Sequence, residues 1–125
     1  MKINLKGTGI ELTEAITEYA TKKITSVEKF INKKNEDAVF HVELARTTRH
    51  HKAGEIFKAE VKVSGAGLDL YATAEAEDLY SAIDMVEKEL SQELKHEKGR
   101  SSKLLRRGER KIKGLLKGFP WINRN

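Results

Sequence analysis

Residues 74–90, AEAEDLYSAIDMVEKEL, decide the fold, because the spacing of apolar residues changes within this stretch. Up to Ala74 apolar side chains occupy every second position, which is typical of a strand with one buried face. From Leu79 to Leu94 they recur at three- and four-residue intervals, which predicts an amphipathic helix. Asp78 comes directly before this helix, and a carboxylate is favourable at a helix N-terminus. The chain therefore passes from a strand into a helix at Asp78.

The same two periodicities assign the rest of the chain. Helical spacing predicts a first helix at about residues 14–32, with Thr13 as its N-cap. The polar stretch RTTRHHKAGE, residues 46–55, is expected to be a long exposed loop. The stretch SGAG, residues 64–67, is expected to form a tight hairpin turn. The expected strands cover residues 2–7, 38–44, 57–63 and 68–74, and the second helix covers residues 78–98.

The predicted element order is β-α-β-β-β-α, with one apolar face on every element. A two-layer α+β sandwich satisfies this order, with a four-stranded sheet and both helices on one face. A right-handed first crossover makes the first two strands parallel, and the later strands form an antiparallel meander.

The net charge of +5 is distributed unevenly. Residues 1–98 hold 15 of the 24 Lys and Arg and 18 of the 19 Asp and Glu, a balance of −3. Residues 99–125 hold nine cations and a single anion, Glu109, a balance of +8. Such a basic block usually contacts a polyanion, either nucleic acid or an anionic membrane surface. We therefore expect a domain at residues 1–98 and a basic tail at residues 99–125 that is disordered when free.

The composition also limits the location and the chemistry. The chain has no cysteine, which fits a reducing cytoplasm and excludes disulfides and thiolate sites. No stretch approaches the ~20 apolar residues of a membrane span, so we expect a cytoplasmic protein that is monomeric when free.

No enzyme chemistry is indicated by the motifs. His50 and His51 are adjacent, but Arg49 and Lys52 beside them would repel a metal ion, so no metal site is expected. Glycines in the 64–67 turn lie between strands and do not match a nucleotide loop. We expect neither catalysis, nor a cofactor, nor a small-molecule substrate.

The candidate binding residues are cations on the two helices and in the tail. Stripes of lysine on a helix are often only a solvated face, whereas the tail has too few anions for mutual pairing. The helix candidates are Lys22, Lys23, Lys29, Lys33, Lys88, Lys95 and Lys98. The tail candidates are Arg100, Lys103, Arg106, Arg107, Arg110 and Lys111.

Residues 74–90, together with GIELTEAITEYATKKI at residues 9–24, resemble the ribosome hibernation promoting factor family, also called ribosome-associated inhibitor or protein Y, in its short form. The D-x-Y-x-A-I-D pattern of residues 78–84 is the most specific match. Tyr80, within this pattern, lies one position beyond the apolar stripe. We expect its ring at the edge of the helix–sheet interface, and Tyr80→Ala to cost about 2–4 kcal/mol if the ring is mostly buried.

The resemblance implies a fold similar to double-stranded RNA-binding domains. It also implies docking on the small ribosomal subunit, on its 16S rRNA near the decoding centre, where the protein blocks the sites of mRNA and tRNA. Cations on the helices and the sheet edge would then bind rRNA phosphates.

The family's charges are only partly present. Lys23 and Lys29 stand where members often have Lys or Arg. Positions where members commonly have a cation and this chain has none are Thr17, Ser26, Glu89, Gln92 and His96. The neighbouring Lys88, Lys95 and Lys98 are expected to substitute, and the tail to restore the lost attraction for phosphate.

Two alternatives remain on the sequence alone. The apolar residues of the tail are compatible with a membrane-surface helix, although Gly108, Gly114 and Gly118 disfavour a stable helix. The second alternative is a generic binder of single-stranded RNA that stacks bases on Tyr71 or Trp121.

Overall fold

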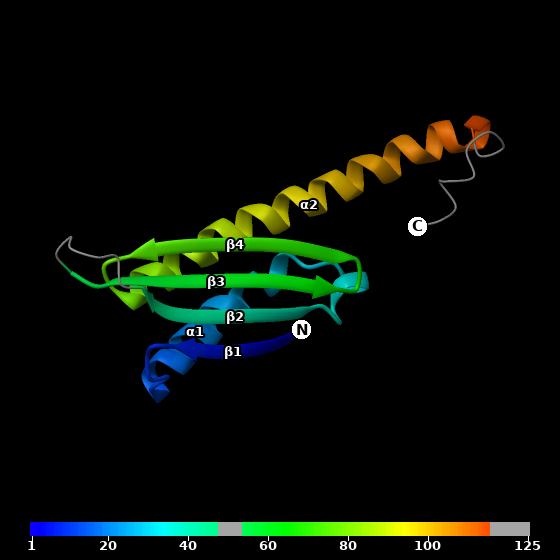
Figure 1. The fold of residues 1–125 in the computed structure, drawn as a ribbon. Helices are drawn as coiled ribbons and strands as arrows, with labels where there is room; N and C mark the ends of the chain where they lie inside the picture. The colour runs from blue at the N-terminus through cyan, green and yellow to red at the C-terminus, as the bar shows by residue number, and fades with distance from the viewer. Residues whose placement is uncertain (48–53, 116–125) are drawn as a thin grey trace.

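The computed structural model describes the backbone of residues 1–47 and 54–115, and the side chains of residues 1–47 and 54–98. Four strands and two α-helices follow the predicted order (Figure 1). The elements are β1 (Lys2–Thr8), α1 (Glu14–Thr25), the 3-10 helices η1 (Ser26–Phe30) and η2 (Lys33–Asn35), β2 (Val39–Thr47), β3 (Ile56–Gly65), β4 (Leu68–Ala76) and α2 (Leu79–Leu115). The loop expected at residues 46–55 starts later than predicted, because Arg46 and Thr47 belong to β2. Its residues 48–53 are outside the described part of the chain.

The sheet has the strand order β1-β2-β3-β4. β1 and β2 are parallel, whereas β3 pairs antiparallel with both β2 and β4. Both α-helices lie on the same side of this sheet (Figure 1). The predicted α+β sandwich and its mixed topology are therefore confirmed.

The core lies between the sheet and the two helices. Alternate residues of the central strands are fully buried, as their period of two predicts. They meet the apolar stripe of α2 and a shorter stripe from α1 and η1. The largest fully buried side chains are Phe40, Ile24, Leu44, Ile83, Leu90, Leu94, Val27, Val61, Val63 and Val86.

The first helix is shorter than expected. The helix predicted to reach residue 32 ends as an α-helix at Thr25 and continues as η1 and η2. The Ser26 hydroxyl donates to the carbonyl of Lys23 at 2.6 Å, and such a local bond competes with α-helical pairing. The tighter turns still bury Val27, so the apolar stripe serves the core despite the change of helix type.

The turn between β3 and β4 has the geometry that its glycines predict. Gly65 and Gly67 have φ of 90° and 85°, and Ala66 between them has φ of 50°. Asn35, which is buried, donates from its side-chain amide to the carbonyl of Ala66 at 2.6 Å. This bond ties the hairpin turn to η2.

The start of α2 also follows the prediction. The Asp78 carboxylate accepts from the backbone N–H of Ser81 at 2.8 Å and from its hydroxyl at 2.7 Å. These bonds from Ser81 hold the pKa of Asp78 below its usual value, because they stabilise the ionised form. Asp78 therefore caps the helix as a carboxylate.

The end of α2 was predicted wrongly. We expected the helix to end near Lys98, but it continues to Leu115 through Gly99, Gly108 and Gly114. With 37 residues the helix is about 55 Å long, and its C-terminal part extends beyond the sheet (Figure 1). Strong helix formers surround these glycines, which explains the continuation. The division into a domain and a basic tail stays a prediction.

No helix in the described ranges is long and apolar enough to cross a membrane.

Candidate nucleic-acid interface

The helix cations lie outside the core, and the structure brings three of them together. A surface groove of about 460 Å³ separates η1 from α2. We call it the Phe30 groove, after the aromatic ring in its wall. Its lining residues are Ser26, Lys29, Phe30, Glu87, Lys88, Ser91, Gln92 and Lys95.

Two lysines make cation–π contacts with the ring of Phe30. The Nζ of Lys29 lies 5.2 Å from the ring centroid, and the Nζ of Lys95 lies 4.7 Å from it. Both distances are in the cation–π range, so the ring orders both ammonium groups. Both positive charges are thus held near one ring in the groove wall, where they attract an anion. The groove is therefore suited to a phosphate group.

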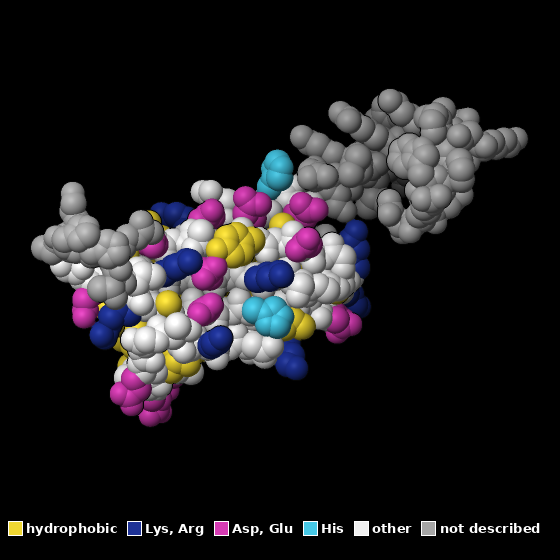
Figure 2. Space-filling model, viewed as in Figure 1, with side chains coloured by type: hydrophobic (Ala, Val, Ile, Leu, Met, Phe, Trp, Pro, Cys, Tyr) yellow, Lys and Arg dark blue, Asp and Glu magenta, His cyan; other side chains and the backbone are white. Residues whose placement is uncertain are grey.

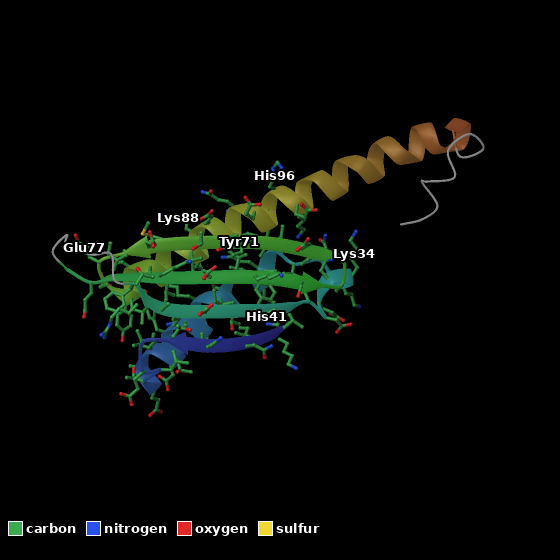
Figure 3. The ribbon with its side chains drawn as sticks, in the orientation of Figure 1. Lys34, His41, Tyr71, Glu77, Lys88 and His96 are labelled. Carbon is green, nitrogen blue, oxygen red and sulfur yellow. The ribbon has the colours of Figure 1, made fainter. Side chains whose placement is uncertain are left out.

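The one carboxylate in the groove wall has a partner of its own. Glu87 accepts a hydrogen bond from the Ser91 hydroxyl at 2.7 Å. Lys29, Lys88 and Lys95 form no ion pair within the described side chains. The three ammonium groups thus remain available to an external anion. Lys88 and His96 are shown on α2 in Figure 3.

Lys23 has a different role from the one the sequence indicated. Its Nζ lies 3.3 Å from the carboxylate of Asp84, and the Tyr19 hydroxyl donates to the same carboxylate. Hydrogen bonding to Asp84 raises the pKa of both Lys23 and Tyr19 above their usual values. Lys23 therefore links α1 to α2 and is already paired with an anion. The pair is half exposed, so its contribution to stability is small.

This link explains the D-x-Y-x-A-I-D pattern of residues 78–84 in physical terms. Asp78 caps α2, and Ala82 and Ile83 are buried in the core. The Asp84 carboxylate accepts a hydrogen bond from the Tyr19 hydroxyl and forms an ion pair with Lys23. Each matched residue thus starts α2 or holds it against α1 and the sheet.

The other predicted cations do not join the groove. Lys22 is exposed on α1. Lys33 lines a separate hollow together with Glu28 and Glu36. Lys98 and Lys34 line a small pocket between η2 and α2. The tail candidates, Arg100, Lys103, Arg106, Arg107, Arg110 and Lys111, lie on the helical backbone of α2, but their side chains are outside the described part.

Two of the five positions that lack the family's cation lie in the groove itself. Ser26 and Gln92 are lining residues, whereas Glu89 and His96 are exposed elsewhere on α2 and Thr17 lies in α1. The groove therefore has three lysines where the resemblance implied more cations.

Phe30 was missed by sequence reasoning. Phe30 lies three residues after Val27, a spacing that marks it as core, and nothing in its local pattern indicates two lysine contacts. Lys95, one of those contacts, is 65 residues away in the sequence, so only the fold reveals the pair.

Tyr80 lies between the two helices and not at the edge of the helix–sheet interface. Its ring is 4.9 Å from that of Tyr19, measured between centroids, at an interplanar angle of 74°. The residue is 42% exposed, so the ring is not mostly buried and the loss of 2–4 kcal/mol expected for a buried ring does not apply.

A mixed sheet covered on one face by two helices, with a lysine-lined groove beside them, defines a small α+β binding domain. The family described as Sigma 54 modulation protein / S30EA ribosomal protein matches residues 3–102. The chain belongs to this family, which confirms the resemblance.

Three individual proteins are also similar to this chain. The ribosome hibernation promoting factor of Salmonella typhimurium is 30% identical over 98 residues, which cover 78% of this chain and 94% of that protein. The Thermus thermophilus Protein Y N-terminal domain has a TM-score of 0.59 and 26% identity, covering 77% of this chain and 98% of that domain. A ribosomal subunit interface protein from Coxiella burnetii has a TM-score of 0.63 and 21% identity, covering 79% and 99% of the respective chains, and this likeness concerns the fold alone.

The Tyr19–Tyr80 contact predicts a modest stability effect. Tyr80→Ala should lower the free energy of unfolding by about 1 kcal/mol, because a T-shaped aromatic pair contributes roughly 0.5–1.5 kcal/mol. Urea unfolding followed by circular dichroism measures this loss. Met85→Ala is a matched control on the same helix, since Met85 is 50% exposed, and it should change stability by less than about 0.5 kcal/mol. Equal losses for the two variants would contradict the proposed role of the ring pair.

Proposed function

We propose that this protein is a ribosome hibernation factor that docks on the small ribosomal subunit near the decoding centre. There it contacts 16S rRNA and occupies space that mRNA and tRNA need. The observation that carries this proposal is the family match over residues 3–102, which spans the sheet, both helices and the Phe30 groove. The role is one of binding in the cytoplasm, with no catalytic step.

The Phe30 groove supports a contact with the rRNA backbone. Structured RNA hides most base edges in its deep major groove, so proteins recognise it largely through shape and phosphates. Lys29, Lys88 and Lys95 offer three ammonium groups at one place on the surface. Each phosphate that they neutralise releases counterions, which favours binding at low salt.

The proposal is tested directly with isolated ribosomal subunits. The purified protein should sediment with the small subunit and not with the large one, and should lower the occupancy of labelled tRNA in the P site. Sedimentation through a sucrose gradient and filter binding of the tRNA measure the two effects. Binding to the large subunit alone, or normal tRNA entry in the presence of bound protein, would overturn the proposal.

Lys95→Ala tests the groove. The variant should flatten the slope of log affinity against log salt by about 0.7–0.9, the contribution of one phosphate contact. Lys22→Ala is the charge-matched control, because Lys22 is exposed on α1 and does not line the groove. An equal change of slope in both variants would show that net charge matters and that the groove does not.

Truncation after Lys98 tests the basic tail. The loss of nine cations should flatten the same slope by roughly three to four, if four or five of them contact phosphates. The melting temperature of the domain should change little, because Leu94 is the last buried residue among the described side chains. Parallel salt plots for the two proteins would exclude phosphate contacts by the tail, and anionic lipid vesicles would then be tested as its partner.

A further inference from the structure

The face of the sheet opposite the helices has a row of four polar and aromatic side chains. Asn4 pairs with His41, His41 with Lys62, and Lys62 with Tyr71, so the row crosses all four strands. The residues next to them, Val42, Val61 and Ala72, are buried beneath the helices. Because side chains alternate along a strand, the row points away from the helices. Figure 3 shows Tyr71 and His41 on this face.

Tyr71 is the most exposed large apolar residue of the described part, with 55% of its surface accessible. Its hydroxyl donates to the carboxylate of Glu60, which also receives Lys58 at 3.2 Å. The bond from Tyr71 keeps the pKa of Glu60 below its usual value, so the acceptor stays ionised. The ring is thus held at its polar end while its face remains open to solvent. Figure 2 shows an apolar ring at the surface of this face.

The row lies in a shallow hollow of about 410 Å³, which is within the range of about 300–1,000 Å³ typical of small-ligand sites. Its lining includes two cations, Lys6 and Lys62, that form no ion pair within the described side chains. Its two carboxylates already have partners. Glu43 accepts from the Thr8 hydroxyl, and Glu60 is bound by Tyr71 and Lys58.

We propose that this face binds single-stranded RNA, with one base stacked on the ring of Tyr71. Lys62, directly beside Tyr71, meets the phosphate that follows the base. The His41 ring and the Asn4 amide, further along the row, provide a second stacking surface and a donor and acceptor for a base edge. Exposed rings on a four-stranded sheet stack bases in the same way in other RNA-binding folds.

The charges of the hollow favour unpaired bases over duplex RNA. Two lysines face two carboxylates, so the net attraction for phosphate is small. A duplex offers mainly phosphates here, because its base faces are stacked inside the helix. A single strand offers the base faces that Tyr71 can stack on, and stacking is tolerant of sequence.

This surface extends the proposed function, because it needs neither the Phe30 groove nor the basic tail. The two surfaces lie on opposite faces of the domain. Each is therefore altered by its own substitutions, and failure of one leaves the other intact.

The test uses the full-length protein and a fluorescently labelled oligoadenylate of about eight nucleotides. Fluorescence anisotropy at about 0.5 M salt weakens purely ionic contacts and leaves stacking. Tyr71→Leu should lower the affinity about five- to a hundredfold, because it removes the stacking ring. Tyr71→Phe retains the ring and should bind within about threefold of the unmodified protein. Tyr80→Leu, which removes a part-exposed tyrosine from the helix side, is the matched control and should bind normally.

Three results would overturn the inference. The first is equal affinity of Tyr71→Leu and the unmodified protein. The second is amide NMR shifts, on addition of the oligoadenylate, that map to α1 and α2 and spare β2, β3 and β4. Equal competition by a duplex of the same length would also contradict it, since that outcome requires phosphate contacts alone. Binding of the small subunit is measured separately with Lys95→Ala, so the two proposals fail independently.

Discussion

Burial of one face of the sheet beneath α2 is the constraint on which the rest of the structure depends. The stripe from Leu79 to Leu94 covers the inner side chains of β3 and β4, while α1 lies against β1 and η1 packs on α2. Most polar side chains of the described part are thereby directed to one of two outer surfaces, whereas Asn35 and Ser91 are buried. The helix side presents a groove between packed elements, and the strand side presents a shallow hollow along a row of side chains.

The groove depends on how α1 and η1 lie against α2. Asp84 receives both Tyr19 and Lys23, and the ring of Tyr80 meets that of Tyr19. Further along the chain from Tyr19 and Lys23, Phe30 at the end of η1 contacts Lys95 of α2. The family pattern at residues 78–84 therefore supports the binding surface indirectly. Its residues set the helix arrangement, and lysines outside the pattern supply the charge.

Local periodicity predicted the sheet, the order of elements and the start of α2, because these depend on alternation and on the cap at Asp78. The α-helical ends at Thr25 and Leu115 were missed. The first depends on a side-chain bond of Ser26, and the second on a balance between glycines and good helix formers. The pairing of Lys23 and the contacts of Phe30 were also missed, because both involve residues of α2 more than 60 positions away. Spacing along a chain contains no information about such contacts.

The charge of the chain and the shape of its surfaces contribute to recognition in different ways. The tail holds a balance of +8 and the domain −3, so long-range attraction to a polyanion originates mainly in the tail. That attraction is screened beyond about 8–10 Å at physiological salt and does not discriminate between phosphates. In the proposed complex, the lysines around Phe30 act at contact distance in a defined geometry, and they select a site that the tail alone would not distinguish. Under this proposal the tail raises the rate of encounter, and the groove sets the position on the RNA.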